Sequence, residues 1–207
     1  MSGSNDSLVV FLHGVGALGA DLAPLAGPLA AFLPSTAFVA PDAPARFDGG
    51  GQGRQWFSVA GITAENRSQR VEQAREGFDR VVSAAIAERG FAGRLDRVAF
   101  FGFSQGSIMA LDAIGGGRWP VAAVVAASGR LPGAADPHSA AAATPVLLLH
   151  GEADATVAAY ESRRAATQLK AAGFTVETRF FARLGHSISS EGVEAAGIFL
   201  ARALKPA

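Results

Sequence analysis

The chain contains no cysteine, and this absence excludes several kinds of site together. Without thiols there is no disulfide, no thiolate nucleophile and no metal site built on cysteine. Charge is also scarce, because charged residues make up 17% of the 207 residues, and 18 basic residues balance 18 acidic ones. Nucleic-acid binding requires a basic patch or stripe, so the sequence predicts no nucleic-acid partner. Any covalent catalysis must use a nucleophile other than cysteine.

Long apolar runs are missing as well. The first run, 8–12, is too short for a signal-peptide core or a membrane span, and the polar start MSGSNDS contains no basic residue. We therefore predict a cytoplasmic protein without an integral membrane segment. Apolar residues nevertheless make up 49% of the chain, a content that excludes a disordered protein. The length fits one domain that covers residues 1–207.

Short apolar runs alternate with stretches of helical periodicity, the pattern of an α/β domain with a mostly parallel central sheet and helices on both faces. Apolar residues recur at three- and four-residue steps from Val71 to Ala85, before Gly90, a C-cap candidate, and predict a helix there. Most of the strand candidates are apolar throughout, as expected for strands covered on both faces. The predicted strands are 8–12, 36–40, 97–103, 121–127, 145–151 and 175–181, and further helices are expected at about 21–33, 105–114, 157–172 and 189–204.

A glycine-rich turn, HGVGALG, follows the first predicted strand and allows two interpretations. Gly14, Gly16 and Gly19 match the G-x-G-x-x-G fingerprint of dinucleotide sites, and Asp42 follows the next strand, where an acid would bind a ribose. Two prolines soon after the turn interrupt the helix that would point its N-terminus at a pyrophosphate. The alternative is a turn whose backbone amides face a cleft, and the sequence favours it over a nicotinamide-dependent oxidoreductase.

The segment Gly102 to Gly106, GFSQG, matches G-x-S-x-G between a predicted strand and a predicted helix. In such an elbow the serine takes a strained conformation, and glycines on both sides admit the close approach of strand and helix. The helix that begins there also points its positive end at a developing oxyanion. We therefore predict that Ser104 is a nucleophile; the alternative is a tight turn without a chemical role.

A serine hydroxyl needs a neighbouring base, and the base needs an orienting acid. In hydrolases with this elbow the order along the chain is serine, acid, histidine, so only histidines after Ser104 compete. His150 ends a predicted strand, where packing or a local bond is expected, and His138 lies in a loop with no acid beyond Asp136. His186, in RLGHS after the last predicted strand, is the predicted base; the alternative is an exposed loop histidine.

Two carboxylates follow the strand that ends in HG. Asp154 is predicted to orient His186, with Glu152 as its nearest rival, and a solvated loop carboxylate is the alternative for either. The oxyanion hole of such an enzyme needs one amide from the residue after the nucleophile and one from the loop after the first strand. Those residues are Gln105 and Val15.

The chain resembles the phospholipase/carboxylesterase family of α/β-hydrolases, which includes the acyl-protein thioesterases. The resemblance covers nearly the whole chain and rests on HGVGALGADL, PDAPARF, GRQWFSV, GFSQGSIMAL, SGRLPG, HGEADATV and GHSIS, in this order. It implies an α/β-hydrolase fold without a lid domain, and a hydrolase of carboxylic esters that needs no metal and no cofactor. It also places Phe47, Trp56 and Phe57 beside the site, where they would line an acyl groove, although aromatic residues are more often part of a core.

These residues together predict a serine carboxylesterase that acts through an acyl-enzyme intermediate. The absence of an insertion long enough to form a lid, and the few aromatic residues near the site, predict a preference for short- to medium-chain esters. The expected partner is a small-molecule ester, with a lysophospholipid or an acyl thioester as the alternative on the same triad. The oligomeric state stays open, with a homodimer among the options. The alternative from another class is a non-catalytic ligand-binding protein on the same fold, because a fold alone does not establish activity.

Overall fold

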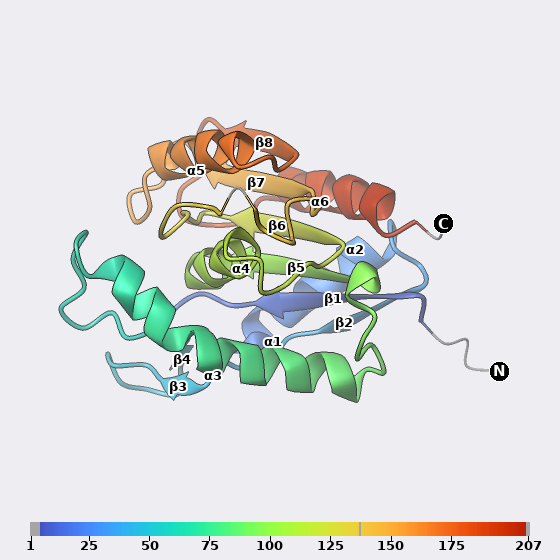
Figure 1. Cartoon of the computed structure of the whole chain (residues 1–207), viewed down its shortest axis with the longest axis horizontal. Coiled ribbons are helices and arrows are strands. Elements are labelled where there is room, and N and C mark those ends of the chain that lie inside the picture. Colours follow the sequence, from blue (N-terminus) through green and yellow to red (C-terminus); the bar gives the residue numbers. More distant parts are fainter. Residues whose placement is uncertain (1–4, 137, 206–207) are drawn as a thin grey trace.

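Six parallel strands form the central sheet of the computed structural model, which describes residues 5–136 and 138–205 (Figure 1). Every pair of neighbours in the sheet runs parallel. All six predicted strands are confirmed, with boundaries that differ by one or two residues. Their order across the sheet is β2 (Thr36–Val39), β1 (Ser7–Leu12), β5 (Val98–Phe103), β6 (Ala123–Ala127), β7 (Val146–Gly151) and β8 (Val176–Phe181).

The carboxyl ends of these strands meet at one edge of the sheet. Leu12 at the end of β1 pairs with Gly102 of β5, and Phe103 pairs with Ala127 at the end of β6. Because the strands are parallel, the loops after β1, β5, β7 and β8 all leave from this edge. In open α/β sheets this is the edge where ligands bind.

Helices cover both faces of the sheet, as predicted (Figure 1). Alternate residues of one strand point to opposite faces, so Val10 packs in one core and Phe11 in the other. Gly90 follows the longest helix with a left-handed φ of 78°, the conformation expected of a glycine at a helix end. One face carries α3 (Arg67–Glu88), α4 (Gln105–Gly115) and α5 (Ala159–Ala171), and the other carries α1 (Gly19–Leu22), α2 (Ala26–Ala30) and α6 (Ser190–Ala203).

The helix predicted at about 21–33 is divided, in line with the interruption expected from Pro24 and Pro28. The chain instead forms α1, a single 3-10 turn η1 (Ala23–Leu25) and α2. Pro24 and Pro28 have no backbone N–H and their rings clash with a preceding helical turn, so each is tolerated only where a new turn begins. The irregular stretch 41–56 also contains a small hairpin, β3 (Ala45–Arg46) and β4 (Arg54–Gln55), whose strands are too short to leave a periodic signal.

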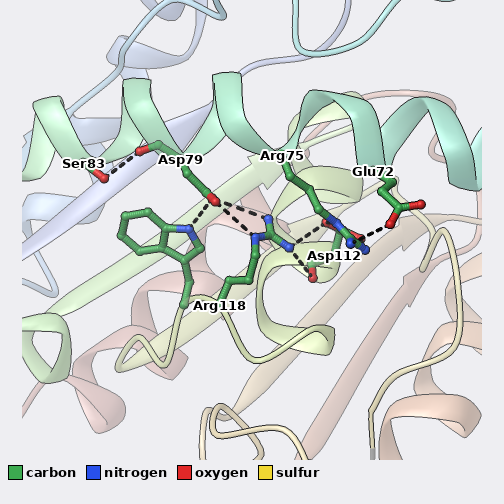
Figure 2. A network of polar contacts seen from close by, with 7 residues as sticks. Glu72, Arg75, Asp79, Ser83, Asp112 and Arg118 are labelled. Atoms are coloured by element: carbon green, nitrogen blue, oxygen red, sulfur yellow. Dashed lines mark hydrogen bonds and ion pairs between the residues drawn. The ribbon is translucent and has the colours of Figure 1, made fainter.

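An ion-pair network holds α4 against α3 (Figure 2). Arg75 of α3 donates to both carboxylate oxygens of the buried Asp112 on α4, at 2.9 and 3.0 Å. Arg118 donates to the same carboxylate at 3.0 Å. A two-pronged arginine–carboxylate pair at a buried position is stronger and more directional than an exposed ion pair. Because α4 begins at the serine elbow, this network fixes the helix on which the elbow depends.

Among the residues that the structure describes, no helix is both long and apolar enough to cross a membrane. Those residues also contain no group of three or more His, Asp or Glu side chains of the kind that holds a metal ion. The first four residues of the polar start of the chain lie outside the described ranges.

Candidate active site

Ser104 lies between β5 and α4 in a strained backbone conformation, with φ 51° and ψ −114°. A positive φ is costly for a residue that has a Cβ, and it is typical of a nucleophile elbow. Two glycines permit the tight turn. A Cβ on Gly106 would stand 2.0 Å from the carbonyl oxygen of Leu12, and one on Gly102 would stand 2.6 Å from the nitrogen of Ser107. Both glycines of the motif are therefore required by the close approach of α4 to the sheet.

Ser104, His186 and Asp154 come from three loops and form one chain of hydrogen bonds. Nδ1 of His186 lies 2.7 Å from Oδ2 of Asp154, and because a carboxylate only accepts, Nδ1 carries the hydrogen. Nε2 of the neutral ring then accepts a hydrogen bond from the Ser104 hydroxyl at 2.9 Å. The Asp154 side chain is fully buried, whereas 22% of the His186 side chain is exposed. The imidazole thus contacts the serine on one side of the ring and the buried acid on the other.

The Asp154 carboxylate is held by its own loop. Oδ1 accepts hydrogen bonds from the backbone N–H groups of Thr156 and Val157, both at 2.9 Å. Burial raises the pKa of this carboxyl, but the bonds from Val157, His186 and Thr156 outweigh burial and hold the pKa below its ordinary value. The carboxylate beside His186 is therefore ionised at neutral pH.

The rival residues bond elsewhere. Glu152 is partly exposed and forms an ion pair with Arg163 on α5. His138 is exposed in the loop between β6 and β7, and His150 is buried with Nδ1 2.6 Å from the hydroxyl of Ser162. Within residues 5–136 and 138–205, the one histidine that bonds to the elbow serine is the one that sequence analysis predicts as the base.

The two amides predicted for the oxyanion hole lie on the expected segments. Val15 is in the turn after β1, and Gln105 is the first residue of α4. In the described part of the chain, neither N–H donates a hydrogen bond. Nδ1 of His13 lies 2.7 Å from the carbonyl oxygen of Gly14 and donates to it. The N–H of Val15 belongs to the same planar trans peptide and points the opposite way, so this bond fixes the direction of that N–H.

The segment 56–57 connects the turn that carries the Val15 amide to the start of α4, which carries the Gln105 amide. Nε1 of Trp56 donates to the carbonyl oxygen of His13 at 2.9 Å. The side-chain amide of Gln105 accepts from the backbone N–H of Trp56 and donates to the carbonyl of Phe57, both at 2.7 Å. Trp56 and Phe57 are both buried in the core between α3, α4 and the sheet. Their predicted role as walls of an acyl groove stays a prediction.

The hairpin β3–β4 supports the glycine turn after β1. The N–H of Gly16 donates to the carbonyl of Arg54 at 2.8 Å, and the ring of Phe47 lies so close that a Cβ on Gly16 would stand 3.3 Å from it. Asp42, the acid considered for a ribose, accepts a hydrogen bond from the N–H of Gly19 at 2.7 Å. The glycines of the turn therefore serve close packing around the Val15 amide.

The sequence predicts no role in the site for His13, and only packing or a local bond for His150. Both are buried: Nδ1 of His13 donates to the carbonyl of Gly14, and Nε2 of His150 lies 3.3 Å from Oδ2 of Asp154. Each precedes a glycine directly after an apolar strand, in LVVFLHG and in PVLLLHG. This repeated HG dipeptide is the sequence signal that would have singled them out.

Comparison with known proteins gives similarities over most of the chain. The sequence pattern of the phospholipase/carboxylesterase family matches residues 2–204. Esterase YpfH of Escherichia coli strain K12 is 32% identical over 187 residues, which are 90% of this chain and 78% of that protein. The crystal structure of esterase PE8 is similar with a TM-score of 0.86 and 33% identity, over 98% of this chain and 95% of the other. The crystal structure of acyl-protein thioesterase 2 of Zea mays is similar with a TM-score of 0.74 and 26% identity, over 99% of this chain and 96% of the other.

Proposed function

The chain belongs to the phospholipase/carboxylesterase family, has the α/β-hydrolase fold and is a hydrolase of carboxylic esters, and on this premise we propose that Ser104 is its nucleophile. The observation that carries the proposal is the unbroken chain of hydrogen bonds from Ser104 through His186 to Asp154. Membership of this hydrolase family argues against the two other classes that the sequence left open, a dinucleotide-dependent oxidoreductase and a non-catalytic binding protein.

In the proposed mechanism the Ser104 hydroxyl attacks the ester carbonyl carbon while Nε2 of His186 takes its proton. The N–H groups of Val15 and Gln105 bind the oxyanion of the tetrahedral intermediate. Collapse of this intermediate breaks the ester bond, and His186 returns its proton to the leaving alcohol. Water then attacks the acyl-enzyme with His186 as base, which releases the acid and restores the serine. Asp154 holds the Nδ1 hydrogen in place and stabilises the imidazolium.

The proposed substrates are short- to medium-chain esters. Where they are described, the stretches 41–56 and 129–144 hold only turns and a hairpin with strands of two residues each, and nothing long enough to enclose an extended chain. Each methylene that a groove buries adds about 0.8 kcal/mol, but a chain left in water adds almost nothing. Acyl thioesters are the second candidate, favoured by the likeness to the Zea mays thioesterase, and lysophospholipids are the third.

Covalent labelling with a fluorophosphonate tests the nucleophile. We expect one adduct on Ser104, and we expect Ser104→Ala to lower kcat by roughly four to six orders of magnitude while the fold stays intact. Ser83→Ala, on the exposed face of α3, is the matched control and should keep full activity. An adduct on Ser107 or Ser128 would refute the assignment.

A substrate series tests the acyl preference. Nitrophenyl esters from acetyl to palmitoyl should give the highest kcat/KM at the short and medium lengths. The same preparation is assayed on a lysophospholipid and on an acyl thioester, which separates the three candidate substrate classes. A steady rise of kcat/KM out to palmitoyl would contradict the proposed preference and indicate a covered acyl channel.

A further inference from the structure

Asp154 lies between two histidines. Its Oδ2 is 2.7 Å from Nδ1 of His186 and 3.3 Å from Nε2 of His150, the histidine near the end of β7. The side chains of His150 and Asp154 both have an exposed fraction of 0%. On the other side of its ring, His150 places Nδ1 2.6 Å from the hydroxyl of Ser162 on α5. A second serine–histidine pair therefore meets the proposed Ser104–His186 pair at one carboxylate oxygen.

The neighbours of His150 define where its ring carries a hydrogen. Nε2 lies 2.7 Å from the carbonyl oxygen of Val157, which only accepts, so Nε2 carries a hydrogen. The same nitrogen lies 3.3 Å from Oδ2 of Asp154. In the neutral ring Nδ1 accepts from the hydroxyl of Ser162, which also lies 3.3 Å from the carbonyl of Gly129. The nitrogen that His150 places 3.3 Å from the carboxylate thus carries a hydrogen and no lone pair.

The second pair is buried too deeply for chemistry of its own. Ser162 and His150 are each 1% exposed as whole residues, so no ester carbonyl reaches the hydroxyl. The role of His150 is explained instead by Val157, which bonds to both His150 and Asp154. Its N–H donates to Oδ1 of Asp154 at 2.9 Å, and its carbonyl accepts from His150. His150, Val157 and Asp154 therefore form a closed set of contacts that prevents rotation of the carboxylate.

We propose that His150 is a positioning residue of the catalytic triad, which acts by holding Oδ2 of Asp154 against His186. This inference rests on the proposed function, because a positioning role requires that Asp154 orient the base. Without the imidazole, the carbonyl of Val157 loses its donor and the loop 154–157 gains freedom to turn the carboxylate away from Nδ1. His150 does not touch substrate, so its loss lowers kcat and leaves KM nearly unchanged.

Three variants and one control test this role. His150→Leu removes both ring nitrogens and should lower kcat by roughly tenfold to a hundredfold, with KM changed by less than about twofold. His150→Gln keeps an N–H near the position of Nε2 and should recover most of the loss. Ser162→Ala leaves the ring in place without its second bond and should have an intermediate effect. His138→Leu removes an exposed histidine and should have no effect.

A double-mutant cycle with Asp154→Asn separates positioning from general stability. If His150 acts through Asp154, His150→Leu should change kcat by less than about twofold once Asp154 is already asparagine. An equal loss of kcat in both backgrounds, or no recovery with His150→Gln, would overturn the inference. Thermal unfolding of each variant identifies any that fails to fold, in which case His150→Gln and Ser162→Ala complete the cycle. If Asp154→Asn alone keeps full activity, the result refutes the proposed triad itself, and the inference about His150 with it.

Discussion

The α-carbon of Gly151 lies so close to the carbonyl oxygen of Leu184 that a Cβ at position 151 would stand 2.1 Å from that oxygen. The backbone N–H of Ala153 donates to the same oxygen at 3.0 Å. The loop that carries Asp154 and the loop that carries His186 are therefore bonded side by side at the end of β7. The short distance between Asp154 and His186 depends on the absence of a side chain at Gly151.

Gly151→Ala should consequently push the loop 184–186 away and lengthen the Asp154–His186 contact. We expect kcat to fall by roughly tenfold to a hundredfold, because small displacements of catalytic groups are costly, together with a lower melting temperature. Steady-state kinetics and thermal unfolding measure the two effects. Gly27→Ala is the control, since a Cβ there meets no neighbouring atom within 4 Å. A Gly151→Ala enzyme with unchanged kcat would show that the loops adapt without loss of geometry.

Features with a strong local signal could be predicted from the sequence. The apolar runs identified all six strands of the central sheet, and GFSQG between a strand and a helix identified the elbow at Ser104. The contact between Gly151 and Leu184 could not be predicted, because it joins segments whose meeting is decided by the packing of β7 beside β8. The bonds between Gln105 and segment 56–57 are equally remote in sequence, and only the folded chain brings them together.

Which of Asp154 and Glu152 contacts His186 is harder to predict from the sequence. Both carboxylates follow β7, so spacing and order favour neither. In the structure they differ in direction, because Glu152 pairs with Arg163 on α5 while Asp154 turns toward His186. The arginine comes from α5, later in the chain, and no local pattern around position 152 predicts this ion pair.

This difference in direction predicts the ranking of two variants. Asp154→Asn should keep the geometry but lower kcat on the order of 10⁴-fold near neutral pH, because an asparagine favours the wrong imidazole tautomer. Glu152→Gln should cost less than about tenfold, since an exposed ion pair contributes little. Both proteins are checked for folding by circular dichroism and assayed on one short-chain ester. The opposite ranking would move the acid to Glu152.

The indole of Trp56 offers a test of the support around the amides proposed for the oxyanion hole. Trp56→Phe keeps an aromatic ring next to Phe78 but removes the bond from Nε1 to the carbonyl of His13. Leaving that buried carbonyl unpaired should cost about 1–3 kcal/mol of stability. Because the peptide that follows carries the Val15 amide, we also expect a lower kcat and weaker binding of a trifluoromethyl ketone, which forms the oxyanion on Ser104.

Trp119→Phe is the matched control for this prediction. In the wild-type protein Nε1 of Trp119 donates to Asp79 at 2.6 Å, in the network between α3 and α4. Loss of the bond from Trp119 to Asp79 should lower the stability of the protein without a selective effect on binding of the ketone. Equal effects of the two substitutions on ketone affinity would argue against a specific role of Trp56.

His13 predicts how stability depends on pH. Nδ1 donates to the carbonyl of Gly14 and Nε2 accepts from the N–H of Ala43 at 2.9 Å, so both bonds require the neutral ring. Burial lowers the pKa of His13 from its ordinary value of 6.5, although the bond to Gly14 and the charge of Asp42 act in the opposite direction. Between this lowered pKa and 6.5 the unfolded chain binds the proton and the folded protein does not. The free energy of unfolding should therefore fall as the pH drops below 6.5, by at most about 1.4 kcal/mol per pH unit from this group.

His13→Asn isolates this contribution, because asparagine retains an N–H donor near the position of Nδ1 but does not titrate. Urea unfolding of both proteins between about pH 5 and pH 8 gives the difference in their free energies of unfolding at each pH. The difference should be constant above pH 6.5 and should shrink on acidification, as the wild-type protein alone loses the contribution of the neutral ring. The other histidines are common to both proteins and cancel in the difference. If the difference in free energy of unfolding stays level over the whole pH range, or grows on acidification, then His13 is not held neutral beside the glycine turn after β1.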